Sequence, residues 1–275
     1  MQERFDAIIL AGYDPERPHA FVATHSEPHK VLIPVGGRPM LARVLDALAA
    51  TPVIARCVVV GFEANPLPAA PGDDASARAD ADAQELHFIP NQGSIYHNLI
   101  AAFEFLGARQ DHSRHVFLIS ADVPLLQPRH VEWFVNACAP LDKDLYMSVV
   151  EKQVMEQTFP QSTRTYVPLR EGRFCNGELL LTRISAALQR QEIYADIISR
   201  RKSTLRQVQL LGPGLLLKFL LRRLALRDVL GFVRRRIRIE AAAVPLPFAE
   251  TGMDVDKPSQ LALVEMYLAD PPKAL

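Results

Sequence analysis

The chain has 275 residues, of which 49% are hydrophobic, and its 31 basic and 31 acidic side chains give a formal net charge of zero. That apolar content can fill one sizeable core, whereas the balanced charge excludes a global attraction to nucleic acid or to an anionic membrane. The three cysteines are too far apart to predict a disulfide framework or a zinc site. Because the N-terminus also lacks a signal-peptide pattern, we expect a cytoplasmic protein.

The first half of the chain alternates apolar runs with amphipathic stretches. Such alternation predicts an α/β protein with a mostly parallel sheet whose strands are buried on both faces. The predicted strands are 6–11, 56–62, 85–90 and 115–120, and the predicted helices are 39–50, 94–107 and 128–139. In such sheets ligands bind beyond the carboxyl ends of the strands, so we expect the chemistry to follow Ala11, Pro90 and Ser120.

The second half has a less regular pattern. An excursion rich in Ala, Asp and Pro over residues 66–84 is expected to lie on the surface. After it we predict strands at 144–150, 163–169 and 237–246, a mostly helical stretch over 184–236, and a last helix that begins at Lys257 and Pro258.

Two acidic elements stand at predicted strand ends. Asp122 follows the strand 115–120. A carboxylate at the end of a buried strand is well suited to bind a magnesium ion. The alternative is that Asp122 caps the helix near Pro128. Asp254 and Asp256 lie in a segment that we expect to be extended, and we expect only one of them to face the same site as Asp122. For Asp256 the alternative role is also a helix N-cap.

One lysine, Lys30, ends the long polar loop that follows the first strand. A lysine there can bind phosphate as a compact charge, and the small residues Ala11 and Gly12 permit a nucleotide to approach the backbone. A solvated lysine is the alternative. The chain has neither GxGxxG after the first strand nor GxxxxGK[ST], which disfavours a dinucleotide-dependent dehydrogenase and a P-loop enzyme.

Three pieces of the chain, in this order, resemble a known family. IILAGY, a loop and HKVLIPVGGRPML resemble the LAGG, loop, K-x-L-x-P-x-x-G-x-P-M-L signature of nucleotidyltransferases with the GT-A fold. ADVPLL resembles the family's metal-binding D-x-P-L-L, and GMDVDKPSQLALVE resembles its closing I-D-T-P-E-D-L element. The chain is similar to the MobA-like group, around molybdenum cofactor guanylyltransferase.

The resemblance implies a three-layer, Rossmann-like α/β fold with a mostly parallel central sheet and a helical elaboration on the acceptor side. We expect one domain over 1–275, with a nucleotide-binding core at 1–140, the acceptor-side elaboration at 141–245, and a metal-binding segment with the C-terminal helix at 246–275. The implied enzyme transfers an NMP moiety from an NTP to a phosphorylated small-molecule acceptor, with Mg²⁺, and releases pyrophosphate.

The resemblance also implies roles for single residues. Lys30 and Asp122 would be catalytic, and Asp122 and Asp256 would hold the magnesium ion. The implied nucleotide-binding residues are Ala11, Gly12, Arg17, Lys30, Gly93, Ser94 and Asn98. This chain departs from the pattern at Tyr13, which replaces the second glycine of LAGG.

The acceptor is expected to contact polar residues of the second half. Arg164 and Asn176 fall near predicted strand ends, and Lys202 belongs to the basic run SRRKST. Such a cluster suits a phosphorylated acceptor, although exposed arginines are also ordinary surface residues.

Three alternatives stay open. A GT-A glycosyltransferase would carry D-x-D after the middle strand, where this chain has ADV. A catalytically weak or inactive nucleotide-binding regulator is suggested by Tyr13. The Leu/Arg-rich stretch 214–236 could form a helix on a membrane surface; because Asp228 and Gly231 interrupt its pattern, we favour helices packed on the protein, with arginine stems over apolar surface.

Overall fold

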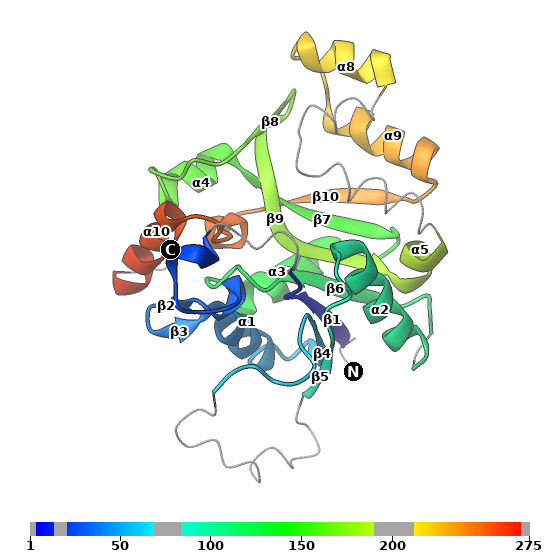
Figure 1. The fold of residues 1–275 in the computed structure, drawn as a ribbon. Helices are drawn as coiled ribbons and strands as arrows, with labels where there is room; N and C mark the ends of the chain where they lie inside the picture. The colour runs from blue at the N-terminus through cyan, green and yellow to red at the C-terminus, as the bar shows by residue number, and fades with distance from the viewer. Residues whose placement is uncertain (1–3, 14–20, 69–83, 110, 190–211, 271–275) are drawn as a thin grey trace.

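The computed structural model describes residues 4–13, 21–68, 84–109, 111–189 and 212–270. One mixed sheet crosses the molecule, and helices cover both of its faces (Figure 1). A short antiparallel pair, β2 (Pro34–Val35) and β3 (Arg38–Pro39), lies outside this sheet.

The central sheet has the strand order β10-β7-β9-β6-β1-β4-β5, with β8 paired to β9. All neighbours are parallel except those of β9, which runs antiparallel to β6, β7 and β8. The strands are β1 (Phe5–Leu10), β4 (Ile54–Val60), β5 (Glu85–Ile89), β6 (His115–Ser120), β7 (Leu145–Glu151), β8 (Val167–Leu169), β9 (Gly172–Arg183) and β10 (Ala241–Leu246). The mostly parallel sheet predicted from the sequence is therefore confirmed.

Helices make the two outer layers. The described helices are α1 (Met40–Ala49), α2 (Ile95–Gly107), α3 (Pro128–Cys138), α4 (Lys152–Thr158), α5 (Ile184–Gln189), α8 (Gly212–Leu220), α9 (Leu226–Ile237) and α10 (Pro258–Ala269), with short 3₁₀ turns η1 (Val22–Thr24), η2 (Lys30–Leu32) and η3 (Ala249–Gly252).

Successive residues of β1 show how the layers form. Ile8 packs in a cluster with Phe103 of α2 and Ala187 of α5, whereas Ile9 packs in the main core with residues of α1, α3 and α10. Both isoleucines are fully buried. Because side chains alternate along a strand, this places one helical layer on each face, as the continuous apolar runs predict.

The predicted strands and helices of the first half are all present, with ends shifted by a residue or two, and α10 begins at Pro258 as expected. The excursion over 66–84 falls almost entirely outside the described residues. The sequence reasoning did not anticipate α4, nor β9, the long strand between β6 and β7 that reverses the sheet direction. The division of the chain into three functional parts stays a prediction.

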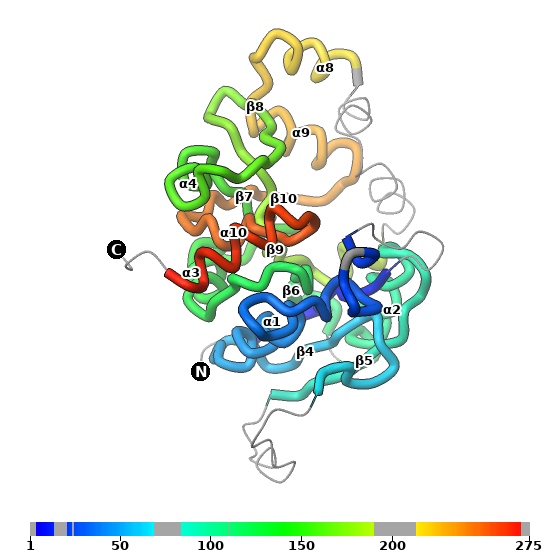
Figure 2. The backbone as a smooth tube through the Cα atoms, turned by 60° about the vertical axis from the view of Figure 1, so that its left-hand side comes forward, coloured from blue at the N-terminus to red at the C-terminus, as the bar shows by residue number. Residues whose placement is uncertain are grey.

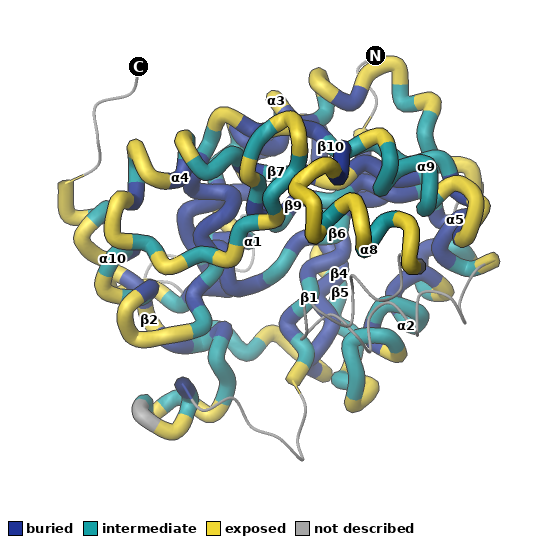
Figure 3. Tube along the Cα trace, turned by 90° about the horizontal axis from the view of Figure 1, so that it is seen from above, coloured by how far each residue is buried: buried dark blue, intermediate teal, exposed yellow. Residues whose placement is uncertain are grey.

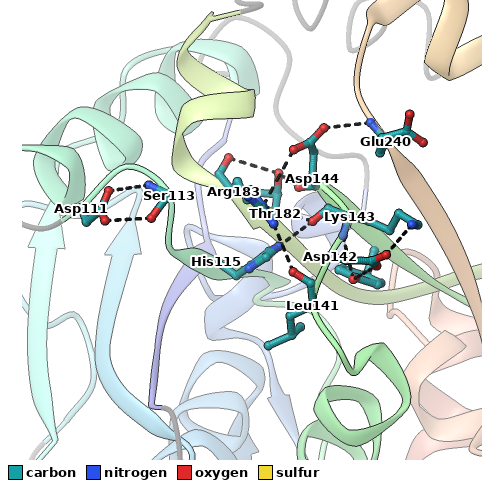
Figure 4. A network of polar contacts seen from close by, with 11 residues as sticks. Asp111, Ser113, His115, Leu141, Asp142, Lys143, Asp144, Thr182, Arg183 and Glu240 are labelled. Carbon is teal, nitrogen blue, oxygen red and sulfur yellow. Dashed lines mark hydrogen bonds and ion pairs between the residues drawn. The ribbon is translucent and has the colours of Figure 1, made fainter.

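A polar network closes the sheet at the end where β6 begins (Figure 4). The Asp144 carbonyl accepts hydrogen bonds from the Arg183 backbone and the Thr182 hydroxyl, and the Asp144 carboxylate accepts one from the Glu240 backbone. His115, the first residue of β6, contacts the Lys143 carbonyl at 2.8 Å. These hydrogen bonds connect β6, β7, β9 and β10 at the end of the sheet where β6 begins, opposite its carboxyl end.

No helix in the described part of the chain has the length and apolar character needed to span a bilayer. Of the two helices from the Leu/Arg-rich stretch, α9 packs as we expected: Ile237 and Val233 lie with Leu145 and Ala186 in a small apolar cluster. By contrast, α8 has no buried residue among those described.

Candidate active site

Three aspartates meet at the carboxyl end of β6. Asp122 follows that strand, and Asp254 and Asp256 follow η3. Each offers a carboxylate oxygen, and these oxygens lie within 4.8 Å of one another. The Val255 backbone NH donates to the Asp122 carbonyl at 2.9 Å, which joins the two segments directly.

The expectation that only one of Asp254 and Asp256 faces Asp122 is therefore wrong. Side chains two residues apart on extended backbone point to the same face, because successive side chains alternate. Asp254 and Asp256 are two residues apart and face the same place. Val255 between them points the other way and is fully buried.

The capping alternatives for these aspartates are also resolved. Gln127, not Asp122, occupies the N-cap of α3, where it forms a capping box with His130. Lys257, not Asp256, is the N-cap of α10. Asp122 instead accepts a hydrogen bond from the Ser120 hydroxyl at 2.5 Å, and the Asp256 NH donates to Gln260.

Lys30 bridges two of the three carboxylates. Its ammonium group contacts Asp122, and it contacts Asp256 Oδ1 at 2.5 Å. Burial alone would lower the pKa of Lys30, but the attraction of Asp122 and Asp256 outweighs burial and raises this pKa above its usual value. Lys30 is therefore charged and partly neutralises the cluster, which excludes the reading of a solvated lysine.

Arg164 neutralises the third carboxylate. It forms an ion pair with Asp254, and only 11% of its side chain is exposed. Burial raises the pKa of Asp254, as do Asp122 and Asp256, while Arg164 counteracts them. Of the residues expected to bind the acceptor, Arg164 thus lies in the carboxylate cluster.

Glu178 is a site residue that the sequence reasoning missed. It follows Gly177 on β9, and burial together with Asp254 and Asp122 raises its pKa to about 8. Its position depends on a bulge, because β7 pairs through Met147 with Leu180 and then through Val149 with Asn176. Ser148 thus faces three residues of β9 in place of one. The available signal was an acidic residue directly before three leucines.

A glycine permits this bulge. A Cβ added to Gly177 would lie 2.3 Å from Ser148 Oγ, the atom that accepts the Leu179 NH. Any other residue there would push β9 away from β7 and move Glu178.

The segments after β1 and β5 also meet. A Cβ on Gly12 would lie 1.9 Å from Asn98 Nδ2, so any larger residue there requires the Asn98 amide to move. Asn98 is held in turn by Asn91 and by the Gln92 NH. Ser94 caps α2 by accepting the His97 NH.

Gly93 adopts φ +78°, the left-handed region that suits glycine, and Ala11 is buried at 3% exposure. Together with the contact between Gly12 and Asn98, this shows that strand ends far apart in sequence come together as expected.

Tyr13, in place of the family's glycine, has a defined environment. Its ring lies 4.5 Å from the His29 ring, and His29 makes an edge contact with Phe62 at 5.2 Å. Burial lowers the pKa of His29. Tyr13 keeps 43% of its surface exposed, directly beside the residue that precedes Lys30.

Arg17 and Lys202 lie outside the described residues, so their contacts stay predictions. Asn176 is exposed on β9, and the described contacts of the three aspartates do not include it.

The cluster suits a hard divalent cation. Carboxylate oxygens are the ligands that Mg²⁺ prefers, with one or two of them completed by water or phosphate oxygens. Three carboxylates this close repel one another unless cations neutralise them. In this structure Lys30 and Arg164 do so, which leaves the donor set compatible with a metal ion.

Comparisons with known proteins show the family and the fold of this chain. The model of the family described as "MobA-like NTP transferase domain" matches residues 7–190. The bifunctional protein GlmU of Rhizobium rhizogenes (strain K84 / ATCC BAA-868) is 33% identical over 122 residues, which are 44% of this chain and 23% of that protein. The chain therefore spans less than a quarter of this curated relative.

Three solved structures share the fold. A hypothetical transferase from Thermus thermophilus is 32% identical, with a TM-score of 0.75 over 94% of this chain and 99% of that one. The 4-diphosphocytidyl-2C-methyl-D-erythritol synthase of Anaerococcus prevotii DSM 20548 is 14% identical (TM-score 0.55, 97% and 96% covered). A CMP:2-keto-3-deoxy-manno-octonic acid synthetase in complex with CTP is 15% identical (TM-score 0.53, 98% and 100% covered). The last two likenesses concern the fold alone.

Proposed function

Because this chain belongs to the MobA-like NTP transferase domain family, and hence to the nucleotidyltransferases with a GT-A-like fold, we propose that it transfers an NMP moiety from an NTP to a phosphorylated acceptor and releases pyrophosphate. The single observation that carries the proposal is the cluster of Asp122, Asp254 and Asp256 with Lys30 in contact. It lies beyond the carboxyl end of β6, where ligands of such sheets bind.

The proposed reaction is an in-line displacement. An oxygen of the acceptor phosphate attacks the α-phosphorus, the bond to the β-phosphate breaks, and pyrophosphate leaves with the electron pair. The nucleophile is already an anion, so the protein contributes positioning and charge neutralisation rather than a base.

Mg²⁺ is part of the proposal. Asp122 and Asp256 would hold it, with Asp254 as a third carboxylate that the structure adds to the expected pair. When bound, the ion supplies Lewis-acid stabilisation of the charge on the phosphoryl oxygens. Lys30 is charged and close to the same place, so it is positioned to neutralise a phosphate when a metal takes over its carboxylates.

The donor and acceptor sides are assigned from the two halves of the site. Gly12 and Asn98, which touch, would contact the nucleotide together with Ala11, Gly93 and Ser94; Arg17 is included from the family pattern alone. On the other side Arg164 would contact the acceptor phosphate, with Asn176 and Lys202 as further predicted contacts. The free, buried state of the described cysteines supports the expected cytoplasmic location.

Pyrophosphate release tests the proposal. The protein is incubated with ATP, GTP, CTP or UTP, with and without Mg²⁺, and with a panel of phosphorylated sugars, alditols and cofactor precursors. We expect release with at least one NTP and acceptor pair, only when Mg²⁺ is present, and the loss of this release in Asp122→Asn. Asp270→Asn, which alters an exposed aspartate after α10, is the matched control.

Two other outcomes favour the alternatives. NTP binding in a calorimeter without turnover on any acceptor indicates a nucleotide-binding regulator. Turnover of a nucleotide sugar, but of no NTP, indicates a glycosyltransferase. Calorimetric titration with Mg²⁺ in the presence of NTP measures metal binding apart from activity, and binding unchanged by Asp122→Asn would exclude Asp122 as a ligand.

A further inference from the structure

The end of helix α8 exposes a ridge of leucines. Leu217 and Leu220 of α8 and Leu221, directly after it, are 57%, 68% and 57% exposed. The Leu221 NH donates to the Leu217 carbonyl at 2.9 Å, which continues the helical turn. The spacing of these leucines by three and four residues places them on one face, because residues so spaced are neighbours on a helix. Figure 2 shows α8 at one end of the molecule, beyond α9 and β8, and Figure 3 shows its exposed turns on the outside. We call these three residues the leucine ridge.

Helix α9 shows that the apolar residues of the stretch 214–236 are not all exposed. The apolar residues Val233 and Ile237 of α9 pack against the end of the sheet. No residue of the leucine ridge belongs to an apolar cluster of the described residues. A contiguous exposed apolar face of this kind is typical of a surface that binds something.

The segment that carries the leucine ridge is strongly basic, and Arg222 and Arg223 directly follow Leu221. Residues 212–238 contain eight basic residues, Lys218, Arg222, Arg223, Arg227, Arg234, Arg235, Arg236 and Arg238, against one acidic residue, Asp228. Lys218 pairs with Asp228 at 2.7 Å, and Arg234 pairs with Glu240 at 2.8 Å. Within the described part of the chain, the other six form no ion pair with a carboxylate, and all six are exposed.

We propose that α8 and the arginines that follow it form a docking surface for an anionic membrane. A leucine ridge flanked by arginines matches the acyl boundary and the anionic headgroups of a bilayer surface. Nucleic acid would account for the arginines but leaves the leucines without a role. A second copy of the chain would bring two strongly positive surfaces together, which is repulsive. The net charge of zero over the whole chain makes this attraction local, so it orients the protein with α8 toward the lipid.

Vesicle flotation tests this surface with the full-length protein. We expect the protein to float with phosphatidylcholine vesicles that contain phosphatidylglycerol and to stay behind with pure phosphatidylcholine. Binding should weaken as salt is added, because exposed charges are screened. Absence of flotation with the anionic vesicles overturns the proposal.

Two variants separate the apolar and the charged contributions. Leu217→Gln/Leu220→Gln/Leu221→Gln keeps good helix formers and should lower partitioning about tenfold or more. Arg222→Asn/Arg223→Gln should lower it about fivefold for each charge removed. Asparagine is used at 222 because this residue has φ +53°, which asparagine tolerates.

Met266→Gln/Arg109→Gln is the matched control, since it removes an exposed apolar side chain and an exposed arginine elsewhere. Circular dichroism and the Tm confirm that each variant is folded. Equal flotation of the leucine variant and the control overturns the proposal. So does light scattering that shows a dimer for the wild type and a monomer for the leucine variant. Binding to DNA that needs the arginines but not the leucines points to nucleic acid and equally overturns it.

Discussion

The two halves of the central sheet build their parts of the active site in different ways. In the first half Asp122 follows the end of β6, which runs parallel to β1, and Lys30 begins the turn η2 in the loop after β1. In the second half Glu178 lies at a bulge within the antiparallel strand β9, and Asp254 follows η3. The first half thus contributes residues that follow strands, whereas the second half also contributes a residue from within a strand.

The difference extends to how charge is balanced. Lys30 forms ion pairs with carboxylates from both halves, Asp122 and Asp256. Among the described residues Arg164 forms an ion pair only with Asp254, which belongs to its own half. Glu178 stays beside them with a pKa raised to about 8. We therefore expect changes in the first half to act mainly on activity, and changes in the second half to act also on stability.

The largest effect is expected at Asp122. Asp122→Asn should lower kcat by about a thousandfold or more, because it removes charge where phosphoryl transfer needs it. The Tm should change little, since Lys30 keeps Asp256 as a partner. Pyrophosphate release measures kcat, and scanning calorimetry measures the Tm. Near-normal kcat would contradict the role given to the first half.

At Arg164 we expect the larger effect on stability rather than on kcat. Arg164→Met leaves Asp254 buried without its cation, which should cost about 3 kcal/mol in the free energy of unfolding. Arg164→Met/Asp254→Asn removes both charges and should recover part of that loss. Urea denaturation compares the two variants. If the double variant is less stable than the single one, the ion pair is not the source of the cost.

Two glycines allow a direct comparison of the halves. Gly177→Ala forces β9 away from Ser148 and should cost about 2 kcal/mol, because packed backbone must shift. Gly12→Ala meets the end of the Asn98 side chain, which can rotate, so its stability cost should be smaller and its main effect should be a higher KM for NTP. Urea denaturation and steady-state kinetics on both variants provide the test, and equal stability losses would erase the distinction.

A separate effect concerns pH. Glu178 has an ordinary pKa near 4.5 that is raised to about 8 in the folded protein. Between these values the folded protein holds a proton that the unfolded chain releases, so the free energy of unfolding falls as pH rises through this window. The contribution is complete below the lower value and lost above the upper one.

Glu178→Gln stays neutral and should lack this decline. As pH rises from about 5 to about 9 without divalent metal, the free energy of unfolding of this variant should therefore increase relative to that of the wild type by roughly 1 kcal/mol or more. Glu171→Gln, at an exposed glutamate before β9, is the control and should follow the wild type. Parallel stability curves for Glu178→Gln and the wild type would show that Glu178 titrates normally.

The sequence predicted more of the fold than of the site. Near-continuous apolar runs marked β1, β4 and β6, because strands buried on both faces need few polar residues. The run over β5 is less apolar because this strand lies at the edge of the sheet with Glu85 and Leu86 exposed. Strand β9 escaped notice because Gly172, Arg173, Asn176 and Gly177 interrupt its apolar pattern. The expectation for Asp254 failed for a different reason, because side chains two residues apart on extended backbone share a face and Asp254 therefore lies with Asp256.

The sequence by itself determined the order of strands and helices, the family motifs, and the positions of Lys30, Asp122 and Asp256. Only the tertiary structure decided which charges meet. Lys30 lies 92 residues from Asp122 and 226 residues from Asp256, yet it contacts both. No local pattern encodes such contacts. They arise because the sheet order places separate strand ends side by side, and because the bulge in β9 and the segment after η3 bring Glu178 and Asp254 close to Asp122.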